Sequence, residues 1–370
     1  MTVALPQPSD VQHCAGHRRT ALFIAIALVA GLLWGTLRLA QLRFAPSEWQ
    51  PSTWVDGRAG RLVNTALGTL PGQSSMDRWS AAFRYRFLGD LGNQVREGCP
   101  GWLFYRDGLR PPPGHVGVMS QRLALMRHWA ERLNSAGVNL LVVTVPDKSR
   151  IEAEQLCGLQ QSPVSQARWD AWHLALAESA VPFVDLRSTL GALPQAFYRT
   201  DVHMAPAGTE AAANRIAKSL LPRLNGKGDQ QFTETHGQQP EVRMGDLIVL
   251  ADLAEAPAGW RPPLERFVPE RIEAQRSGGL LDEGAPVEVV LVGDSNGLRN
   301  AFSERLGRSI GREVWNLSQD GGYFSGAMLS AFARQDSWPS SLKVVVWVFS
   351  ELSLSLPLSA EEQRALDSIR

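Results

Sequence analysis

The sequence predicts an α/β fold, a doubly wound and mostly parallel sheet behind a single N-terminal transmembrane helix. Two observations predict the sheet: β-branched segments alternate with helix-patterned segments, and the β-branched segments are apolar throughout. Continuous apolar runs are typical of strands covered on both faces, and alternating strands and helices are typical of a parallel sheet. A third observation, an uncharged apolar segment near the N-terminus, predicts the membrane helix.

The apolar segment covers residues 20–37 without a charged side chain and continues to residue 42. Because about 20 apolar residues cross a bilayer, we expect an uncleaved anchor over residues 20–42. The alternative is a cleaved signal peptide, which has a shorter apolar core and a small-residue cleavage site. Arginines lie on both sides of the segment, so their distribution alone does not set its orientation.

Charge and cysteine content narrow the functional classes. Basic and acidic side chains both number 37, so the formal net charge is zero and no nucleic-acid partner is indicated. Cys14 precedes the apolar segment, whereas Cys99 and Cys157 follow it. The latter two could form a disulfide in an oxidising compartment, or they could be two separate buried thiols.

Three regions are expected after the anchor. Residues 43–98 have a mixed composition and are predicted to form a membrane-proximal stalk, with helical stretches around residues 76–91. Residues 99–370 are predicted to form the main domain. Within it, residues 224–240 are polar and rich in Gly and Gln, which indicates a mobile surface insertion.

The elements of the main domain follow from local patterns. Residues 99–108 read as a strand and a turn, because Asp107-Gly108 is a hairpin signal. Helical spacing of apolar residues, or a proline at an acceptable first-turn position, predicts helices over 120–135, 165–180, 206–221, 297–306 and 323–333. Continuous apolar runs predict strands over 138–145, 183–186, 287–292, 313–317 and 343–349.

A Gly-Asp-Ser motif, Gly293-Asp294-Ser295, directly follows one of these predicted strands. Ligands of parallel α/β sheets bind beyond the carboxyl ends of the strands. A serine at a strand-to-helix turn has an exposed hydroxyl, and backbone N–H groups near it can hold an oxyanion. The alternative interpretation is that Asp294 or Ser295 only caps the following helix. The motif alone supports both interpretations equally.

Asp201 and His203 are the best partners for such a serine. A serine hydroxyl needs a base within hydrogen-bonding reach and a group that orients the base. These two residues lie two positions apart in a short loop ahead of Pro206. The alternatives are a structural loop histidine or half of a metal site. Because no Cys/His spacing resembles a zinc site, we expect neither a metal nor another cofactor.

The sequence resembles the alginate O-acetyltransferase group of SGNH-hydrolase-like proteins from about Cys99 to the C-terminus. The order of the motifs is distinctive: Asp-x-His precedes Gly-Asp-Ser here, whereas Asp-x-x-His follows it in most SGNH enzymes. The resemblance rests on Gly101-Trp-Leu-Phe-Tyr105, Val145-Pro-Asp-Lys-Ser149, Thr200-Asp-Val-His203 with Pro206 and Gly208, Gly245-Asp-Leu247 and Val292-Gly-Asp-Ser295.

The resemblance implies a function and roles for residues. Ser295 would be the nucleophile, His203 the general base and acid, and Asp201 the orienting carboxylate. An acetyl group would pass from a donor to Ser295 and then to a hydroxyl of an exopolysaccharide. The resemblance also implies a periplasmic domain, with residues 1–19 as a cytoplasmic tail at the inner membrane. A multi-spanning membrane-bound O-acyltransferase is the implied partner.

One part of the chain departs from the wider SGNH pattern. Where other SGNH hydrolases have a Gly-x-Asn-Asp block with an oxyanion Asn, this chain has Val348-Phe-Ser-Glu-Leu352. Asn316 and Gly321-Gly322, which lie after the next strand, could supply oxyanion donors instead. Asn316 and Gly322, together with the Ser295 N–H, are the predicted oxyanion donors. Lys148 is expected to make a structural contact at a strand end.

Three functions are compatible with these residues. The first is exopolysaccharide O-acetylation, and the second is a carbohydrate acetylesterase that passes the acyl group from the same triad to water. The third is a non-catalytic glycan-binding or scaffold subunit of a polysaccharide secretion complex. The polymer, the immediate acetyl donor and the oligomeric state are left open by the sequence.

Overall fold

The computed structural model describes residues 15–43, 45, 50–68, 73–114, 116–275 and 286–369. The chain forms two compact units, Met1–Trp79 and Ser80–Arg370. Most of the predicted tail over residues 1–19, including Cys14, lies outside the described residues. The boundary between the units falls within helix α4, Gln73–Leu88, which accounts for the helical stretch expected around residues 76–91.

The first unit is helical in its described part. Its helices are α1 Ala15–Gln41, α2 Pro51–Val55 and α3 Arg58–Leu67. Within α1, the segment Arg18–Gln41 is long and apolar enough to cross a membrane, and none of its most apolar stretch is buried in the protein. A membrane anchor meets these criteria of length and composition, and a signal sequence near the N-terminus can also meet them.

The second unit contains all the strands of the described residues. Its strands are β1 Val95–Glu97, β2 Leu103–Tyr105, β3 Asn139–Val145, β4 Phe183–Asp185, β5 Phe232–His236, β6 Glu241–Arg243, β7 Glu265–Phe267, β8 Glu270–Ala274, β9 Val289–Gly293, β10 Val314–Asn316 and β11 Val344–Ser350. Its α-helices are α5 Arg106–Leu109, α6 Val118–Ser135, α7 Lys148–Ile151, α8 Pro163–Glu178, α9 Arg187–Gly191, α10 Pro206–Leu220, α11 Asp246–Leu250, α12 Phe302–Ile310, α13 Gly326–Phe332 and α14 Ala360–Ser368. Its 3₁₀ turns are η2 Ala153–Gln155, η3 Leu221–Leu224, η4 Ser295–Leu298, η5 Gln335–Ser337 and η6 Glu351–Leu354.

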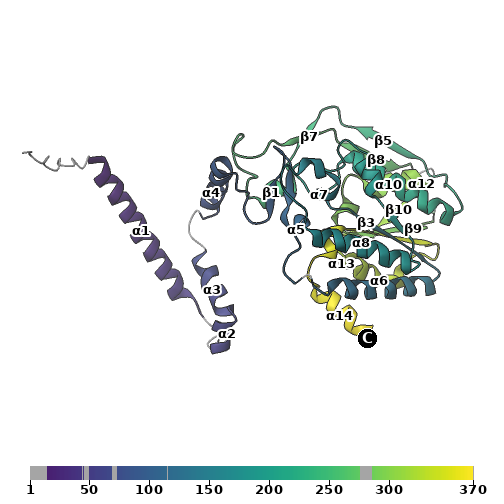
Figure 1. The fold of residues 1–370 in the computed structure, drawn as a ribbon, viewed down its shortest axis with the longest axis horizontal. Coiled ribbons are helices and arrows are strands. Elements are labelled where there is room, and N and C mark those ends of the chain that lie inside the picture. Colours follow the sequence, from purple (N-terminus) through teal and green to yellow (C-terminus); the bar gives the residue numbers. More distant parts are fainter. Residues whose placement is uncertain are drawn as a thin grey trace, which may run out of the picture. The chain divides into compact units, whose positions relative to one another are not determined.

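A five-stranded sheet with the order β10-β9-β11-β3-β4 is the centre of this unit. All neighbouring strands in it are parallel, as the apolar runs predicted. Figure 1 shows helices α10 and α12 above the sheet and helices α6, α8 and α13 below it. The fold is therefore the expected α/β arrangement with helices on both faces of a parallel sheet.

Two apolar cores fill the space between the sheet and these helices. On one face, Phe302 and Leu306 of α12 pack with Ile216 of α10 against alternate residues of the strands. On the other face, Trp129 of α6 and Trp172 of α8 pack against the remaining strand residues. Both faces of each central strand are buried, which explains why its sequence is continuously apolar.

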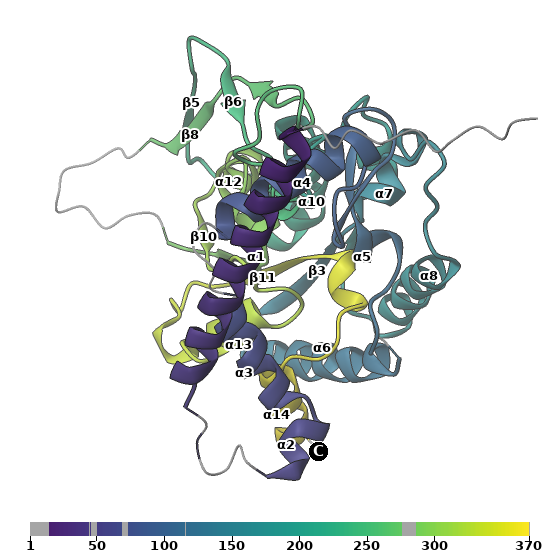
Figure 2. The ribbon, with the colours of Figure 1, turned by 90° about the vertical axis from the view of Figure 1, so that its left-hand side faces the viewer.

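Three smaller two-stranded pairs lie outside the main sheet. The strands β1 and β2 form one pair, β5 pairs antiparallel with β8, and β6 pairs antiparallel with β7. Figure 2 shows β5, β6 and β8 grouped at one end of the unit. The predicted insertion over residues 224–240 thus contains the strand Phe232–His236, whose long-range partner gives no local signal in the sequence.

Two local predictions were wrong. Asp107-Gly108 is not a hairpin turn but lies in α5, and residues 98–102 connect β1 with β2 instead. The helix expected over residues 297–306 is split into η4 and α12. Asn300 and Ala301, with φ values of 53° and 52°, interrupt it because left-handed backbone cannot continue a right-handed helix.

The second unit begins earlier than the domain predicted from residue 99. Ala81, Ala82 and Leu91 are buried in a third apolar cluster, where they pack with Leu247 and Ile248 of α11. Residues 80–98 therefore belong to the fold of the second unit, although their sequence has no strong apolar pattern.

Candidate active site

Ser295 lies directly beyond the carboxyl end of β9, at the first position of η4. The preceding Asp294 fixes this turn, because its carboxylate accepts the N–H groups of Asn296 at 2.9 Å and Ser350 at 2.7 Å. The second bond joins the ends of β9 and β11. Gly293 is required for the close approach of these strands, since a Cβ there would lie 2.4 Å from the carbonyl oxygen of Val348. The serine is thus held at the edge where parallel sheets bind ligands.

The loop that carries Asp201 and His203 is fixed by two buried side chains. Glu265 of β7 accepts both the N–H and the hydroxyl of Thr200 at 2.9 Å. Lys148 donates through Nζ to the carbonyl oxygens of Leu103, Arg199 and Asp201 at 2.6, 2.7 and 3.1 Å. Lys148 therefore makes the structural contact expected from the sequence, joining three segments at the carboxyl end of β3.

Asp201, His203 and Ser295 form a continuous hydrogen-bonded chain. His203 Nδ1 lies 2.7 Å from Asp201 Oδ1, and His203 Nε2 lies 2.8 Å from Ser295 Oγ. The backbone N–H of His203 also donates to Asp201 Oδ1 at 3.1 Å. Asp201 is fully buried and His203 almost so. The arrangement is that of a nucleophile, a base and the carboxylate that orients the base.

Contacts with His203 and a partly buried ion pair with Arg243 keep Asp201 ionised. Arg243 Nη2 donates to Asp201 Oδ2 at 2.6 Å, and the guanidinium of Arg243 lies 4.2 Å from the centre of the Tyr198 ring. Burial alone would raise the pKa of Asp201, but the hydrogen bond and charge of His203 and the charge of Arg243 hold this pKa well below its usual range. A carboxylate beside Nδ1 can then stabilise the imidazolium that forms during proton transfer.

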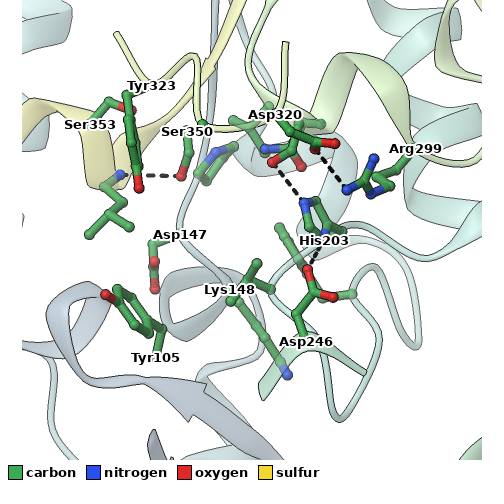
Figure 3. A pocket seen from close by; sticks show the side chains of 18 of the residues that line it. Tyr105, Asp147, Lys148, His203, Asp246, Arg299, Asp320, Tyr323, Ser350 and Ser353 are labelled. Atoms are coloured by element: carbon green, nitrogen blue, oxygen red, sulfur yellow. Dashed lines mark hydrogen bonds and ion pairs between the residues drawn. The ribbon is translucent and has the colours of Figure 1, made fainter. Parts of the chain in front are cut away.

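Asp246 is a second carboxylate near the histidine. Its Oδ2 lies 3.4 Å from His203 Nδ1, and its N–H donates to Asp201 Oδ2 at 3.3 Å. Burial and the charge of Asp201 raise the pKa of Asp246. Figure 3 shows Asp246 next to His203 in the wall of the pocket, linked to it by a dashed line. Asp246 thus adds negative charge close to the base.

These side chains open into a pocket at the carboxyl ends of β3, β9 and β11. Its volume is about 360 Å³, within the range of small-ligand sites. Ser295 and His203 line one part of it, and Tyr105, Asp147 and Tyr323 line another. The pocket is large enough to admit a substrate to the Ser295 hydroxyl.

The predicted oxyanion donors Asn316 and Gly322 do not line this pocket. The Asn316 amide donates to the carbonyl oxygen of Gly297 at 2.8 Å and to Ser303 Oγ at 3.1 Å. The Gly322 N–H donates to the carbonyl oxygen of Gln319 at 3.1 Å. Both groups therefore stabilise the loop instead. Gly321 is the neighbour that does line the pocket.

Cys99 and Cys157 are joined by a disulfide, with their Cα atoms 4.9 Å apart. The bond connects the turn between β1 and β2 to the segment after η2. Next to it, Cys99 N–H donates to the carbonyl oxygen of Gln155 at 2.8 Å. In this structure the two cysteines are thus not separate thiols.

Two groups among the described residues have spacing suited to metal ligands. Asp201, His203 and Asp246 form one, and Glu234, His236 and Glu270 form the other. In the first group, the Asp201 oxygens and His203 Nδ1, which a metal ion would need as ligands, are already used by the hydrogen bond between these residues and by the ion pair with Arg243. In the second, Glu234 and Glu270 form ion pairs with arginines of α12. These contacts account for both clusters without a metal ion.

Sequence reasoning missed several residues of the site. Arg243 and Glu265 lie more than 40 residues from the atoms they bind in the loop of Asp201, and no local pattern marks them. Asp246 belongs to the Gly245-Asp-Leu247 motif, which was a usable signal. Gly245 is needed there because a Cβ would lie 2.1 Å from the carbonyl oxygen of Thr200.

Comparisons with known proteins find relatives among proteins named for alginate acetylation and biosynthesis. "Probable alginate O-acetylase AlgJ" of Pseudomonas fluorescens is 26% identical over 342 residues, covering 89% of this chain and 86% of that protein. "Alginate biosynthesis protein AlgX" of Pseudomonas aeruginosa is 24% identical over 354 residues, covering 90% of this chain and 68% of that protein.

A solved structure shares the fold. The O-acetyltransferase domain of Pseudomonas putida AlgJ has a TM-score of 0.64 and 24% identity, covering 75% of this chain and 99% of that domain. The family described as "SGNH hydrolase-like domain, acetyltransferase AlgX" matches residues 95–351, which include the whole central sheet and the chain of Asp201, His203 and Ser295. The protein thus belongs to the AlgX-type family of SGNH-hydrolase-like acetyltransferase domains.

Proposed function

We propose that this chain is a serine-dependent O-acetyltransferase that acts on an exopolysaccharide. The observation that carries the proposal is the unbroken hydrogen-bonded chain from Asp201 through His203 to Ser295, which ends in a pocket. Relatives named alginate O-acetylases support the reaction class.

Two displacements would transfer the acetyl group. In the first, His203 Nε2 takes the proton of Ser295 Oγ as that oxygen attacks the acetyl carbonyl carbon, and His203 then returns the proton to the departing oxygen of the donor. In the second, a sugar hydroxyl gives its proton to Nε2 and attacks the acetyl-serine. Ser295 Oγ leaves with that proton, and the sugar retains the acetyl group.

The backbone N–H groups of Ser295 and Gly321 are the proposed oxyanion donors. Gly321 lines the pocket and has a φ of 68°, which the glycine adopts without strain. Within the part of the chain that the structure describes, neither N–H has a protein acceptor. Donors aimed at a developing oxyanion typically contribute about 3 kcal/mol each to the transition state.

We further propose that the second unit lies in the periplasm and is anchored to the inner membrane by α1. The uncharged apolar helix supports an anchor, and the Cys99–Cys157 disulfide supports an oxidising compartment. A membrane-bound O-acyltransferase that supplies acetyl groups across the membrane is the proposed partner.

The test uses the full-length chain in detergent with p-nitrophenyl acetate as the donor. Acetyl-sugar should form when an oligosaccharide is added, and Ser295→Ala should abolish both this product and ester hydrolysis. Ser337→Ala, at an exposed serine of η5, is the matched control. Acetyl-sugar formation by Ser295→Ala at the wild-type rate would refute the mechanism. Release of acetate alone, with every acceptor tested, would favour an acetylesterase.

A further inference from the structure

Helix α4 exposes a row of large aromatic side chains. Trp79, Phe83 and Phe87 recur at the four-residue spacing that places side chains on one face of a helix, and they are 60, 53 and 58% exposed. The ring centres of Phe83 and Phe87 lie 4.6 Å apart. Soluble proteins rarely expose large contiguous apolar groups, so this row of three residues, called the aromatic stripe below, indicates an interaction surface.

The other side of α4 is already packed against protein. Ala81 and Ala82 are buried, and they belong to the same apolar cluster as Leu247 and Ile248 of α11. Helices that are apolar on more than one face are usually buried in protein or in lipid. The second unit thus covers one apolar face of α4 and leaves the aromatic stripe exposed.

Arginines border the aromatic stripe. The guanidinium of Arg86 lies 5.6 Å from the centre of the Phe87 ring, and Arg84 pairs with Asp90 at 3.7 Å. Aromatic rings next to arginines are typical of helices that lie in the interface of a bilayer. There the rings lie at the depth of the headgroups, and the long arginine side chains reach the lipid phosphates. The composition of this face therefore suits a lipid surface that carries negative charge.

The chain keeps the start of α4 close to the candidate membrane span. Leu67, the last residue of α3, packs against α1, since its Cδ2 would lie 3.7 Å from a Cβ at Gly35. Gly35 belongs to the span Arg18–Gln41 and lies roughly 9 Å from its carboxyl end, at 1.5 Å per residue. From Leu67 the chain reaches at most about 20 Å to Gln73, the first residue of α4. With α1 in a bilayer, α4 therefore begins at or close to the bilayer surface.

We propose that α4 lies in the interface of the bilayer, with the aromatic stripe at the boundary between headgroups and acyl chains. The inference rests on the proposed anchoring by α1 and adds a second, peripheral membrane contact. Because α4 packs against α11, and Leu250 of α11 lines the pocket, this contact would hold the pocket at a set distance from the membrane. An anchor alone would leave that distance variable.

The test measures the depth of α4 with the full-length chain in liposomes of phosphatidylcholine and phosphatidylglycerol. In a Cys14→Ser background, the remaining native cysteines form the disulfide, and Ser80→Cys carries an NBD fluorophore. Ser80 is exposed and lies three residues before Phe83 on the same face. Ser337→Cys, at an exposed serine of η5, is the matched control.

Lipid with a nitroxide near the top of its acyl chain should quench the label at position 80 more strongly than the label at position 337. We expect a difference of roughly threefold or more, because an interfacial helix lies about 5–10 Å into the boundary between headgroups and acyl chains. Equal quenching at the two positions, in a chain that stays in the liposomes, would overturn the inference and leave the proposed anchor intact.

Substitutions then assign the contact to the aromatic stripe. Phe83→Ser combined with Phe87→Ser should reduce the quenching at position 80 to the level of the control position. Leu174→Ser, at an apolar residue of α8 that is 61% exposed, should leave it unchanged. Ester hydrolysis in detergent should stay at the wild-type rate in each variant. If the double variant loses hydrolysis, Phe83→Asp alone should still lower the quenching, and quenching retained in that variant would contradict the inference.

Other occupants of the stripe and a failure of the anchor give different results. A blue-shifted emission at position 80 that nitroxide lipid does not quench would show that a protein surface, such as a second copy of the chain, covers the stripe, and this would refute the membrane contact. Release of the chain from the liposomes by alkaline carbonate would instead refute the proposed anchor, on which the inference rests.

Discussion

The two walls of the pocket use their polar atoms in different ways. On the wall of Asp201 and His203, both carboxylate oxygens and both ring nitrogens have partners within the protein. On the part of the pocket lined by Tyr105, Asp147 and Tyr323, Asp147 keeps one carboxylate oxygen without a donor among the described residues. Fully paired groups are preorganised for one reaction, whereas a fixed but unpaired acceptor is suited to a ligand. The contrast separates chemistry from recognition within one pocket.

Substitutions in the hydrogen-bonded chain of Asp201, His203 and Ser295 should have the largest effect on the reaction rate. Asp201→Asn and Ser295→Ala should each lower ester hydrolysis by about 10³-fold or more, because either change disables the same proton-transfer unit. The double variant should be hardly slower than Ser295→Ala alone. The measurement is the rate of p-nitrophenyl acetate hydrolysis, and multiplicative losses in the double variant would mean that the two residues do not act together.

Lys148, a buried residue in the lining of the pocket, should make folding stability depend on pH. Burial lowers the pKa of Lys148 from its usual 10.5 to about 7, although the charges of Glu265 and Asp201 raise it in part. Between these two pH values the unfolded chain binds more protons than the native protein, so the free energy of unfolding should rise with pH. The rise should be on the order of a few kcal/mol.

The check is urea unfolding measured from about pH 7, the pKa of Lys148 in the native protein, to about pH 10, close to the usual lysine pKa. Lys148→Met should remove most of the rise, whereas Lys343→Met, at a half-exposed lysine paired with Glu288, should retain it. Identical pH profiles for wild type and Lys148→Met would show that the buried ammonium does not have a lowered pKa.

Arg243 should affect the reaction but not the choice of acceptor. Arg243→Gln removes the charge beside Asp201 and should lower hydrolysis and transfer alike by roughly tenfold, the size expected for one charged hydrogen bond. Arg271→Gln, on the exposed side of β8, is the matched control. A loss of transfer without a loss of hydrolysis would mean that Arg243 takes part in acceptor binding, which would contradict the division of roles within the pocket.

Gly108 should have the smallest effect, confined to the side of the pocket that Asp147 lines. Gly108→Ala displaces Asp147 and should lower transfer by about fivefold while leaving ester hydrolysis unchanged. Gly191→Ala, where a Cβ would meet nothing within 4 Å, should change neither rate. A parallel loss of hydrolysis in Gly108→Ala would show that the two walls are mechanically coupled.

Local patterns in the sequence predicted the central sheet well. The strands β3 and β11 are buried on both faces, so five of the seven residues of β3 and six of the seven residues of β11 are apolar, and both strands are recognisable. The motifs with Asp201, His203 and Ser295 were also recognisable, since each lies in a short segment that follows or precedes a predicted element.

The remainder depended on contacts that are distant in the sequence. The pairing of β5 with β8 cannot be read from the polar strand Phe232–His236 alone. Arg243 is recognisable as a site residue only once it lies beside Asp201. Among the residues predicted as oxyanion donors, Asn316 and Gly322 do not line the pocket, whereas the adjacent Gly321 does. No local pattern reveals which peptide of this loop faces the pocket.

The most direct test of the account is the chemical state of Ser295 during turnover. The full-length chain should be mixed with p-nitrophenyl acetate, quenched in acid within the first turnover and digested for mass spectrometry. An acetyl group on the peptide that contains Ser295, lost when an acceptor oligosaccharide is added before the quench, is the predicted result. Turnover without acetylation of Ser295, or an acetyl group on another residue that the acceptor removes, would contradict the account.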